Sequence, residues 1–396
     1  MTSTNEGRLR LTDLSNPILD TDSYKLSHFQ QYPPGTRAVS AYVEARSGGE
    51  IDHVLFFGLQ MYLAEHLSRR VTPADIEAAE EIAAAHGLPF NRAGWELVVK
   101  RHGCRLPLKI EALAEGTIVP TGIPLVQVRT TDPDLFWLAT YVETAMLRAI
   151  WYPSTVATIS HGVKQTIRAA LAKSAEADVA AAVLPFRLHD FGARGTTSRE
   201  QAGIGGLAHL VNFMGTDTLT ALLYARRFYD EPMAGYSIPA AEHSTITAWG
   251  EAGEVDAFRN MIRRFGGPGK LVAVVSDSYD IHRAVEQHWA KTLREEVRAM
   301  GGTVVVRPDS GDPTVVPIDV VEALGAAYGF TTNAKGYKVL AKDVRVIQGD
   351  GVNPVSIRVI LERLLAKGWS AENIAFGMGG ALLQKVNRDT LRFAMK

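Results

Sequence analysis

The stretch LVAVVSDS (residues 271–278) decides the fold, because its pattern recurs throughout the second half of the chain. Five apolar residues, a typical length for a buried strand, end on Ser276, Asp277 and Ser278, and a helical stretch follows. Short apolar runs that alternate with helices are the pattern of a βα fold with parallel strands. The sequence therefore predicts an α/β fold from about residue 184 onward.

Seven such apolar runs occur, and each is followed by polar residues or glycines. In a closed parallel barrel the carboxyl ends of all strands lie on one rim, where active sites assemble. A single Asp or Gly after a strand is more often a turn or a helix cap, but seven such ends, with Arg and His among them, favour a shared site. The runs are LPFRL (184–188), HLVNF (209–213), YSIPAA (236–241), LVAVV (271–275), TVVVRP (303–308), VRVIQ (344–348) and NIAF (373–376).

The part of the chain before these runs mixes element types. RAVSAYVEAR (37–46) alternates like a strand, and residues 106–128 are predicted to form short strands joined by Gly and Pro turns. The pattern of residues 72–87 predicts a helix that begins with Thr72 as N-cap and ends at Gly87. This mixture indicates a separate α+β domain.

A long helical segment covers residues 134–175, and we expect it to break near Pro153, because proline lacks the N–H group that a helix needs. The last residues, LRFAMK (391–396), read as a strand cut short, which predicts a truncated gene product or a fragment. Three regions are predicted: a mixed α+β domain (1–150), an α/β barrel domain (151–390), and the start of a segment that returns to the smaller domain (391–396).

The composition sets limits on the class of protein. The chain has 396 residues, of which 46% are hydrophobic, enough for a large core and more than one domain. The 42 basic and 43 acidic residues give no reason to expect bulk attraction to nucleic acid or membrane. The single cysteine, Cys104, excludes an intrachain disulfide framework and fits a reducing compartment. No apolar run has membrane-spanning length and no signal peptide is recognisable, so we expect a cytoplasmic protein.

The predicted rim carries carboxylates, glycines and a few cations, but no Ser-His-Asp spacing, no HExxH and no P-loop signature. The glycines of FGMGGALLQK (376–385) follow a strand and open a helix, where backbone N–H groups can hold a phosphate. A packing turn explains them equally well. The glycines of GIGGLAHL (203–210) resemble a phosphate turn in the same way but are weaker support.

An aspartate at the end of a strand can bind two adjacent sugar hydroxyls or hold Mg²⁺. Asp309 stands close to Arg307 in such a position, and Asp280 and Asp350 could complete a site, although capping and ion pairing are the alternative. Phosphate, ribose and magnesium together indicate a phosphoribosyl group. Transfer of that group needs orientation, charge placement and a metal-bound pyrophosphate leaving group, so no protein nucleophile is required.

The chain resembles the nicotinamide phosphoribosyltransferase family from about residue 18 to its end, with the motifs in the same order throughout. The motifs that carry the resemblance are DTDSYKLSHFQQYPPGT (20–36), LHDFGARG (188–195), AGIGG (202–206), NFMGTDT (212–218), GYSIPAAEHSTITAWG (235–250), VSDSYDI (275–281), RPDSGDP (307–313), VIQGDG (346–351) and NIAFGMGGALLQKVNRD (373–389).

This resemblance implies the irregular parallel α/β barrel of type II phosphoribosyltransferases, with a smaller domain from the N-terminal region, in a homodimer that shares its active sites. The implied reaction joins nicotinamide to 5-phosphoribosyl 1-pyrophosphate, giving nicotinamide mononucleotide and pyrophosphate in NAD salvage. Mg²⁺ is the implied cofactor, and ATP is an implied co-substrate whose hydrolysis is coupled to the transfer.

The resemblance also implies roles for single residues. Phe191 and Tyr24 of the partner subunit would stack on the two faces of the pyridine ring, and Asp217 would accept a hydrogen bond from its carboxamide. His243 matches the histidine that ATP phosphorylates, and Glu242 beside it would orient the ring. The remaining implied positions are Arg194 and Arg307 near the ring and the ribose phosphate, Asp309 and Asp350 on the ribose, Asp280 with Asp309 near Mg²⁺, Gly379 and Gly380 on the 5′-phosphate, Ser276 and Gly349 as further substrate contacts, and Arg46, Arg388 and Lys396, all from the partner subunit, at the phosphates.

Two alternatives stay open at this point. A related enzyme acting on nicotinate is disfavoured by Asp217, since two carboxylates facing each other repel in a partly desolvated pocket. A catalytically weak binding protein that keeps the fold is disfavoured by the intact set of rim residues.

Overall fold

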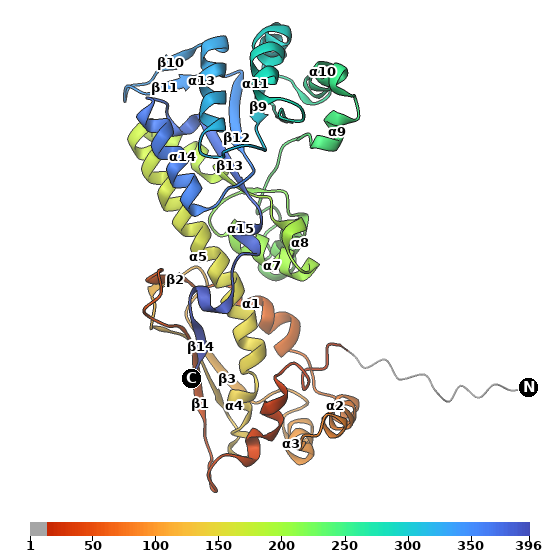
Figure 1. Cartoon of the computed structure of the whole chain (residues 1–396). Coiled ribbons are helices and arrows are strands. Elements are labelled where there is room, and N and C mark those ends of the chain that lie inside the picture. The colour runs from red at the N-terminus through yellow and green to blue at the C-terminus, as the bar shows by residue number, and fades with distance from the viewer. Residues whose placement is uncertain (1–13) are drawn as a thin grey trace, which may run out of the picture. The chain divides into compact units, whose positions relative to one another are not determined.

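The computed structural model describes residues 14–396, which divide into two compact units. Unit 1 comprises the described residues up to Thr155 together with Asn387–Lys396, and unit 2 is Val156–Val386. Figure 1 labels the elements of both units along the chain. No helix of the described part is long and apolar enough to cross a membrane.

Unit 2 is built on a parallel sheet of six strands, in the order β7-β6-β13-β12-β9-β8. Every pairing in it is parallel, as the alternation of apolar runs and helices predicts. The strands are β6 (Leu188–Asp190), β7 (Gly215–Thr216), β8 (Leu271–Val275), β9 (Thr303–Arg307), β12 (Val344–Gln348) and β13 (Ile374–Met378).

The segment 236–241 joins the two edges of this sheet. Tyr236 forms a parallel bridge with Gly215 beside β7, and Ala240 forms one with Ala273 on β8. The sheet therefore curls into an irregular parallel barrel, and the predicted fold class is confirmed. Five of the seven predicted runs lie at or directly before these strands, and the run YSIPAA is the joining segment 236–241 itself. The run HLVNF instead ends a helix, and the short strand β7 follows it.

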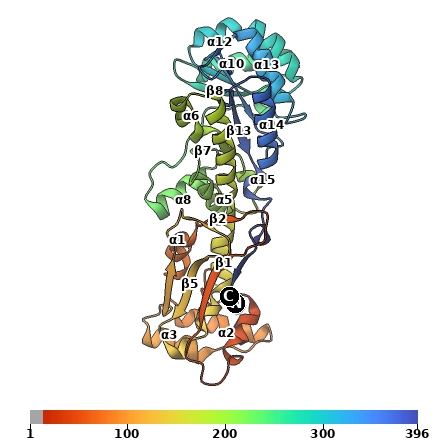
Figure 2. The same ribbon diagram turned by 90° about the vertical axis from the view of Figure 1, so that its left-hand side faces the viewer.

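Helices connect the strands and cover the outside of the sheet. Helix α13 packs against β12, and both views place α14 beside β13 (Figure 1, Figure 2). The helices of unit 2 are the second part of α5 (Glu143–Ser174), α6 (Ala177–Val183), α7 (Arg199–Leu210), α8 (Leu219–Tyr229), α9 (His243–Thr247), α10 (Glu254–Phe265), α11 (Ile281–Arg283), the π-helix η7 (Ala284–Thr292), α12 (Arg294–Met300), α13 (Val316–Tyr328), α14 (Pro354–Ala366) and α15 (Gly380–Leu383), with short 3-10 turns η4 (Leu184–Phe186), η5 (Ala193–Gly195), η6 (Glu251–Gly253) and η8 (Ala371–Asn373) and a hairpin of β10 (Phe330–Thr332) and β11 (Lys338–Leu340).

Unit 1 contains an antiparallel sheet of four strands in the order β14-β1-β5-β3, with Val43, Val128 and Phe393 buried in its core. Its strands are β1 (Ser40–Ala45), β3 (Leu108–Ala112), β5 (Pro124–Thr130) and β14 (Phe393–Met395), and β2 (His53–Leu55) pairs with β4 (Ile118–Pro120). Its helices are η1 (Ser23–Gln30), α1 (Leu59–Tyr62), the π-helix η2 (Leu63–Leu67), α2 (Pro73–Ala85), α3 (Arg92–Arg101), η3 (Pro133–Leu135), α4 (Leu138–Tyr141), the first part of α5, and η9 (Arg388–Thr390).

Helix α2 begins and ends as its sequence predicts. The Asp75 backbone N–H donates to Thr72 Oγ1 at 3.2 Å, and the Thr72 N–H donates to Asp75 Oδ2 at 2.8 Å, which completes a capping box. The helix ends at Ala85, and Gly87 follows with a φ of +85°, in the left-handed region that favours glycine.

The predicted break at Pro153 is wrong, because α5 runs without interruption from Glu143 to Ser174. Gly58 lets the chain pack closely against the proline, since a Cβ at that position would lie 2.3 Å from Pro153 Cγ and 2.7 Å from the Ala149 carbonyl oxygen. The neighbouring Ser154 hydroxyl donates to the Phe57 carbonyl at 3.0 Å. Packing across the proline thus offsets the lost helical hydrogen bond, which costs about 3 kcal/mol in an isolated helix.

The expected phosphate turn in GIGGLAHL is also wrong, since these residues lie inside α7. A Cβ on Gly203 would lie 2.7 Å from the Tyr224 ring, and one on Gly206 would lie 2.8 Å from Ala221 Cβ. Both contacts are to α8. The glycines therefore let α7 and α8 approach closely, so their spacing reflects helix packing and not a phosphate turn.

Candidate functional site

The barrel of unit 2 is hollow. Because alternate residues of a strand face the same side, Thr303, Val305 and Arg307 of β9 all line its interior. Small side chains leave the space open, among them Ala273 and Ala375. The resulting cavity has a volume of about 490 Å³ and extends along the strands. We call this space the lumen.

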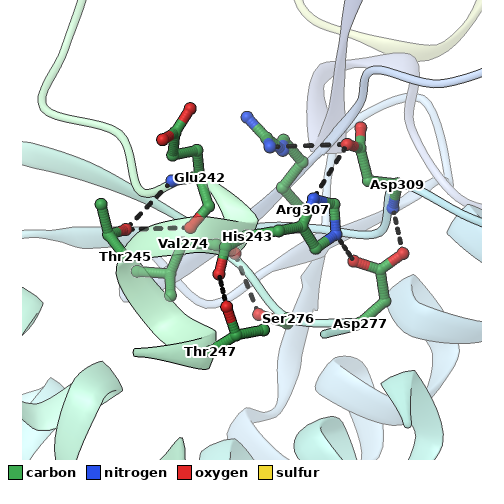
Figure 3. A network of polar contacts seen from close by, with 9 residues as sticks. All are labelled: Glu242, His243, Thr245, Thr247, Val274, Ser276, Asp277, Arg307 and Asp309. Carbon is green, nitrogen blue, oxygen red and sulfur yellow. Dashed lines mark hydrogen bonds and ion pairs between the residues drawn. The ribbon is translucent and has the colours of Figure 1, made fainter. Parts of the chain in front are cut away.

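Four side chains at the carboxyl end of the barrel form a polar network (Figure 3). His243 Nε2 lies 3.0 Å from Asp277 Oδ1, and His243 Nδ1 lies 3.9 Å from Asp309 Oδ2. The Asp309 backbone N–H donates to the second Asp277 oxygen at 2.9 Å, and Arg307 Nη2 lies 3.5 Å from Asp309 Oδ2. Burial raises the pKa of Asp309, and the positive charge of Arg307 opposes that rise.

Asp277 is the member of this network to which the sequence assigned no role. It was recognised only as the polar end of a strand. Its position could have indicated that it belongs to the site. Asp277 follows β8, which pairs with β9, and Asp309 follows β9. Adjacent parallel strands bring their ends together.

Glu242 does not hold the imidazole, contrary to expectation. It is the N-cap of α9, forms a capping box with Thr245, and accepts a hydrogen bond from the Ser244 hydroxyl. Its carboxylate points away from the His243 ring (Figure 3). The capping geometry turns the Glu242 side chain back onto its own helix, and Asp277 is the carboxylate that contacts the ring.

Phe191 and Asp217 line the lumen near its rim. A Cβ on Gly377 would lie 2.0 Å from the Phe191 ring, and one on Gly349 would lie 3.5 Å from it, so the two glycines make room for the ring. Asp217 accepts a hydrogen bond of 2.5 Å from the Ser237 hydroxyl. An aromatic face beside a carboxylate suits a flat heterocycle that carries an N–H group.

Asp190 lies buried beneath these residues. Its Oδ1 accepts the Gly192 N–H at 2.7 Å, its Oδ2 accepts the Thr216 hydroxyl at 3.5 Å, and its carbonyl accepts the Asp217 N–H at 3.0 Å. Burial raises the pKa of this carboxyl to about 6. Asp190 thus connects the turn that carries Phe191 to the turn that carries Asp217.

Ser276, Gly349 and Asp350 also follow rim strands. The Ser276 hydroxyl donates to the Val274 carbonyl at 2.9 Å and accepts the Trp289 Nε1–H at 3.0 Å, so it faces the core. A Cβ on Gly349 would lie 3.0 Å from Asp309 Oδ1. Asp350 is exposed beside that glycine, and its negative charge contributes to the raised pKa of Asp309.

The two glycines expected at the 5′-phosphate open the short helix α15. A Cβ on Gly379 would lie 3.3 Å from the Phe191 carbonyl oxygen, whereas one on Gly380 would face open space. The turn η5, which carries the exposed Arg194, packs against Gly380 through Gly195. The turns that carry Phe191, Arg194 and Gly380 therefore meet at one place.

The carboxylates expected near Mg²⁺ differ in their surroundings. Asp280 caps α11 by accepting the Arg283 N–H at 2.8 Å, and this hydrogen bond lowers the pKa of Asp280. Asp309 instead belongs to the polar network of His243, Asp277 and Arg307. Within residues 14–396 no group of three or more His, Cys, Asp and Glu is arranged to hold a metal ion. Carboxylate oxygens such as those of Asp280 and Asp309 are the kind of ligand that Mg²⁺ binds together with phosphate oxygens and water.

Four expected site residues belong to unit 1. Tyr24 on η1 is 53% exposed and meets His28 edge-on, with ring centroids 4.8 Å apart. The other three make local contacts: Arg46 Nε donates to the Arg392 carbonyl at 2.9 Å, Arg388 lies 3.3 Å from the Asp389 carboxylate, and Lys396 lies 2.5 Å from the Glu44 carboxylate.

Comparison with known proteins indicates the family of the chain. Residues 186–396 match the model of the nicotinate phosphoribosyltransferase (NAPRTase) family, and residues 16–110 match the N-terminal domain of nicotinamide phosphoribosyltransferase. A nicotinamide phosphoribosyltransferase of Xanthomonas campestris pv. campestris (strain 8004) is 58% identical over 383 residues, which cover 97% of this chain and 81% of that protein.

Two solved structures bear on the fold alone. The nicotinate-nucleotide pyrophosphorylase from Pyrococcus furiosus has a TM-score of 0.59 at 16% identity and covers 98% of this chain and 77% of its own. The human nicotinic acid phosphoribosyltransferase has a TM-score of 0.53 at 19% identity and covers 91% of this chain and 72% of its own.

Proposed function

The chain belongs to the nicotinamide phosphoribosyltransferase family, and from this premise we propose that it transfers a phosphoribosyl group from 5-phosphoribosyl 1-pyrophosphate to nicotinamide. It is a transferase with the fold of type II phosphoribosyltransferases. The products of the proposed reaction are nicotinamide mononucleotide and pyrophosphate, in NAD salvage.

One observation carries the choice of base: Phe191 and Asp217 line the same end of the lumen. The Phe191 ring offers a flat apolar face, and the Asp217 oxygen that does not accept from Ser237 can accept the carboxamide N–H. Nicotinate has no N–H to donate and would bring a second negative charge to Asp217. The pocket therefore favours the amide.

The transfer itself needs little covalent help from the protein. The pyridine nitrogen attacks the anomeric carbon while the bond to pyrophosphate breaks, and the leaving group takes the electron pair. Asp309 and Asp350 are the proposed partners of the ribose hydroxyls, and their negative charges also favour the positive charge that develops on the sugar. Gly379, Gly380, Arg194 and Arg307 are the proposed phosphate contacts.

Magnesium would be held by Asp309 and Asp280 together with pyrophosphate oxygens. When bound, the ion would supply positive charge that makes pyrophosphate a better leaving group.

Formation of the mononucleotide by the purified chain tests the proposal. With 5-phosphoribosyl 1-pyrophosphate and Mg²⁺ present, we expect product from nicotinamide at a kcat/KM at least about a hundredfold above that for nicotinate. An equal or higher kcat/KM with nicotinate would show that nicotinamide is not the preferred substrate. No product from either base would leave only the binding-protein alternative.

A second part of the proposal concerns ATP. The contact with Asp277 favours the tautomer of His243 that carries its proton on Nε2, which leaves a lone pair on Nδ1. That nitrogen would attack the γ-phosphorus of ATP, ADP would leave, and the phosphohistidine would later be hydrolysed. Negative charge on His243 would then favour Mg²⁺ with its bound phosphoribosyl donor.

The variant His243→Ala tests this coupling. We expect it to keep a slow basal transfer and to lose both ATP hydrolysis and stimulation by ATP. The measurements are mononucleotide formation with and without ATP, and acid-labile phosphate on the protein. The exposed His86→Ala in unit 1 is the control and should behave as the parent. If ATP stimulated the His243 variant as strongly as the parent, another residue would be the phosphoryl acceptor.

The proposed assembly is a homodimer with shared sites. Tyr24 of the partner subunit would cover the face of the base opposite Phe191, and its large exposed ring leaves it free to do so. Arg46, Arg388 and Lys396, also from the partner subunit, would add positive charge at the phosphates.

A further inference from the structure

Two helical segments of unit 2 begin at residues of the proposed site. Helix α9 begins with His243, and η6 and α10 follow it. The short helix α11 follows β8 and has Asp280 as its N-cap. Figure 1 shows α9, α10 and α11 in the same part of unit 2. The position of the Asp280 carboxylate therefore depends on how α11 is held.

The first turn of α11 orients the Asp280 carboxylate. Its Oδ1 accepts the Arg283 backbone N–H at 2.8 Å, and the Asp280 carbonyl accepts the Ala284 N–H at 2.9 Å. Asp280 is exposed, so packing around the side chain does not fix it. The direction of the carboxylate therefore depends on where residue 283 is held.

The Arg283 side chain connects α11 to the segment that follows His243. Its Nη1 donates to Glu251 Oε1 in η6 at 2.5 Å, and its Nη2 donates to Glu254 Oε2 at the start of α10 at 3.3 Å. His288 Nε2 of η7 lies 3.3 Å from the same Glu254 oxygen. The Glu254 carboxylate thus contacts two side chains of the segment that Asp280 opens.

This polar cluster is costly for stability. Glu254 is fully buried, and burial raises the pKa of its carboxyl, while His288 and Arg283 oppose that rise. Glu254 Oε1 and Arg283 Nε are buried without a partner in the described chain. Buried ion pairs often contribute less to stability than apolar residues of similar size. The Phe258 and Trp289 rings, stacked with centroids 4.8 Å apart, already hold α10 against η7, so the cluster restricts mainly how α11 is oriented.

We propose that Arg283 and Glu254 are positioning residues for the proposed Mg²⁺ site, because they hold α11 and thereby the carboxylate of Asp280. The inference rests on the proposed function, in which Asp280 is one of the protein ligands of the ion. Groups that hold a metal ligand without touching the ion change metal affinity by about ten- to a hundredfold when they are replaced. Loss of these contacts should therefore weaken metal binding and leave the transfer step at saturating metal nearly unchanged.

Binding of Mn²⁺ to the whole chain in the presence of pyrophosphate tests this role directly. Mn²⁺ takes the same oxygen ligands as Mg²⁺, and the electron paramagnetic resonance of the free ion measures how much is bound. We expect Arg283→Met to bind Mn²⁺ about tenfold more weakly than the parent. Glu254→Gln should also weaken binding, because the Arg283 guanidinium then loses one of its two ionic contacts.

The conservative variant Arg283→Lys should recover only part of the affinity. Lysine keeps the positive charge but lacks the planar fork of N–H groups with which arginine contacts two carboxylates. The same variant serves as the test if Arg283→Met does not fold. Parental affinity in Arg283→Lys would then overturn the inference.

The matched control is Arg259→Met, which breaks a similar link between helices. Arg259 Nε on α10 lies 2.7 Å from Glu296 Oε1 on α12, and its other partner is Asp256. We expect this variant to lose stability like Arg283→Met but to keep the parental affinity for Mn²⁺. Melting temperatures of both variants are measured alongside. Equal losses of affinity in the two variants would mean that the effect is one of stability, and would overturn the inference.

The variant Asp280→Asn separates failure of this inference from failure of the metal assignment on which it rests. Weaker Mn²⁺ binding in both Asp280→Asn and Arg283→Met supports the inference. Weaker binding in Asp280→Asn with parental binding in Arg283→Met keeps the metal site and overturns the positioning role. Parental binding in Asp280→Asn would show that the ion does not use Asp280, and would overturn both.

The rate of mononucleotide formation gives an independent measurement. In Arg283→Met the Mg²⁺ concentration for half-maximal rate should rise about tenfold, while kcat at saturating Mg²⁺ stays within about twofold of the parent. A lower kcat with an unchanged Mg²⁺ requirement would mean that Arg283 acts on something other than the metal site, and would overturn the inference.

Discussion

Asp190 controls the geometry of the base pocket without facing the lumen itself. Its side chain fixes the turn at Gly192, and its carbonyl fixes Asp217. Phe191 and Asp217 are thereby positioned by one buried residue. The same burial makes Asp190 sensitive to pH, because a carboxylate without solvent is costly to ionise.

The variant Asp190→Asn should remove a pH dependence of stability. Burial raises the pKa of Asp190 from 3.8 to about 6, so the folded state binds more protons than the unfolded state between these values. The free energy of unfolding of the parent should therefore fall as pH rises from about 4 to 6, by up to about 3 kcal/mol from this residue. Denaturation at several pH values should show this fall in the parent and a smaller one in the variant. Parallel curves would mean that Asp190 ionises normally.

Asp217 sets the preference for the base. We expect Asp217→Asn to reduce the selectivity for nicotinamide over nicotinate about tenfold or more, because a neutral amide no longer repels a carboxylate. The check is the ratio of kcat/KM values for the two bases. Asp230→Asn is the control, since Asp230 is exposed with a φ of +52°, which asparagine also adopts. An unchanged ratio would remove Asp217 from the recognition of the base.

At the scale of elements, the sequence predicted those helices and strands that depend on interactions between residues close together in the chain. The cap at Thr72 and the strand at residues 40–45 follow from side-chain hydrogen bonding and from alternation. The continuity of α5 through Pro153 did not follow, because the residue packed against the proline, Gly58, is far away in the sequence. The glycines of α7 misled for the same reason: their partner is another helix.

The fit between Gly58 and Pro153 can be measured. A side chain at Gly58 faces a φ of +108° and a contact of 2.3 Å, so Gly58→Ala should lower the free energy of unfolding by about 2–4 kcal/mol. Gly116→Ala is the matched control, because its φ of +87° is also left-handed but no atom lies within 4 Å of the added Cβ. It should cost only about 1 kcal/mol in the same denaturation experiment. Equal losses would attribute the effect to φ alone.

For the molecule as a whole, the rim was predictable and its internal contacts were not. Seven polar strand ends in sequence predicted one site, and the structure brings His243, Asp309 and Arg307 together. The sequence did not indicate that Asp277 holds the imidazole or that the Ser276 hydroxyl turns into the core. Both depend on the direction of a side chain after a strand, which periodicity does not specify beyond the last paired residue.

The proposed dimer predicts complementation between two damaged chains. Tyr24→Ala and Phe191→Ala should each lose most activity, because each removes one aromatic face of the base pocket. In a mixed dimer one site carries both lesions and the other is intact, so random mixing should restore up to about a quarter of the parental sites. Activity is measured after re-equilibration, with mixed dimers verified by size and mass. Mixed dimers without recovery would place both residues in one subunit's site.

The segment 236–241 closes the barrel with few hydrogen bonds. Tyr236 exchanges two backbone hydrogen bonds with Met214 and Thr216, and on the other side Ala273 exchanges two with Pro239 and Ala241. Pro239 within the segment has no N–H to donate. In deuterated water the Tyr236 and Ala241 amides should therefore exchange well before that of Val274, which lies inside the continuous ladder of β8 and β9. Local unfolding would begin here, and each opening would expose the side of the lumen to solvent while the rest of the barrel stays intact.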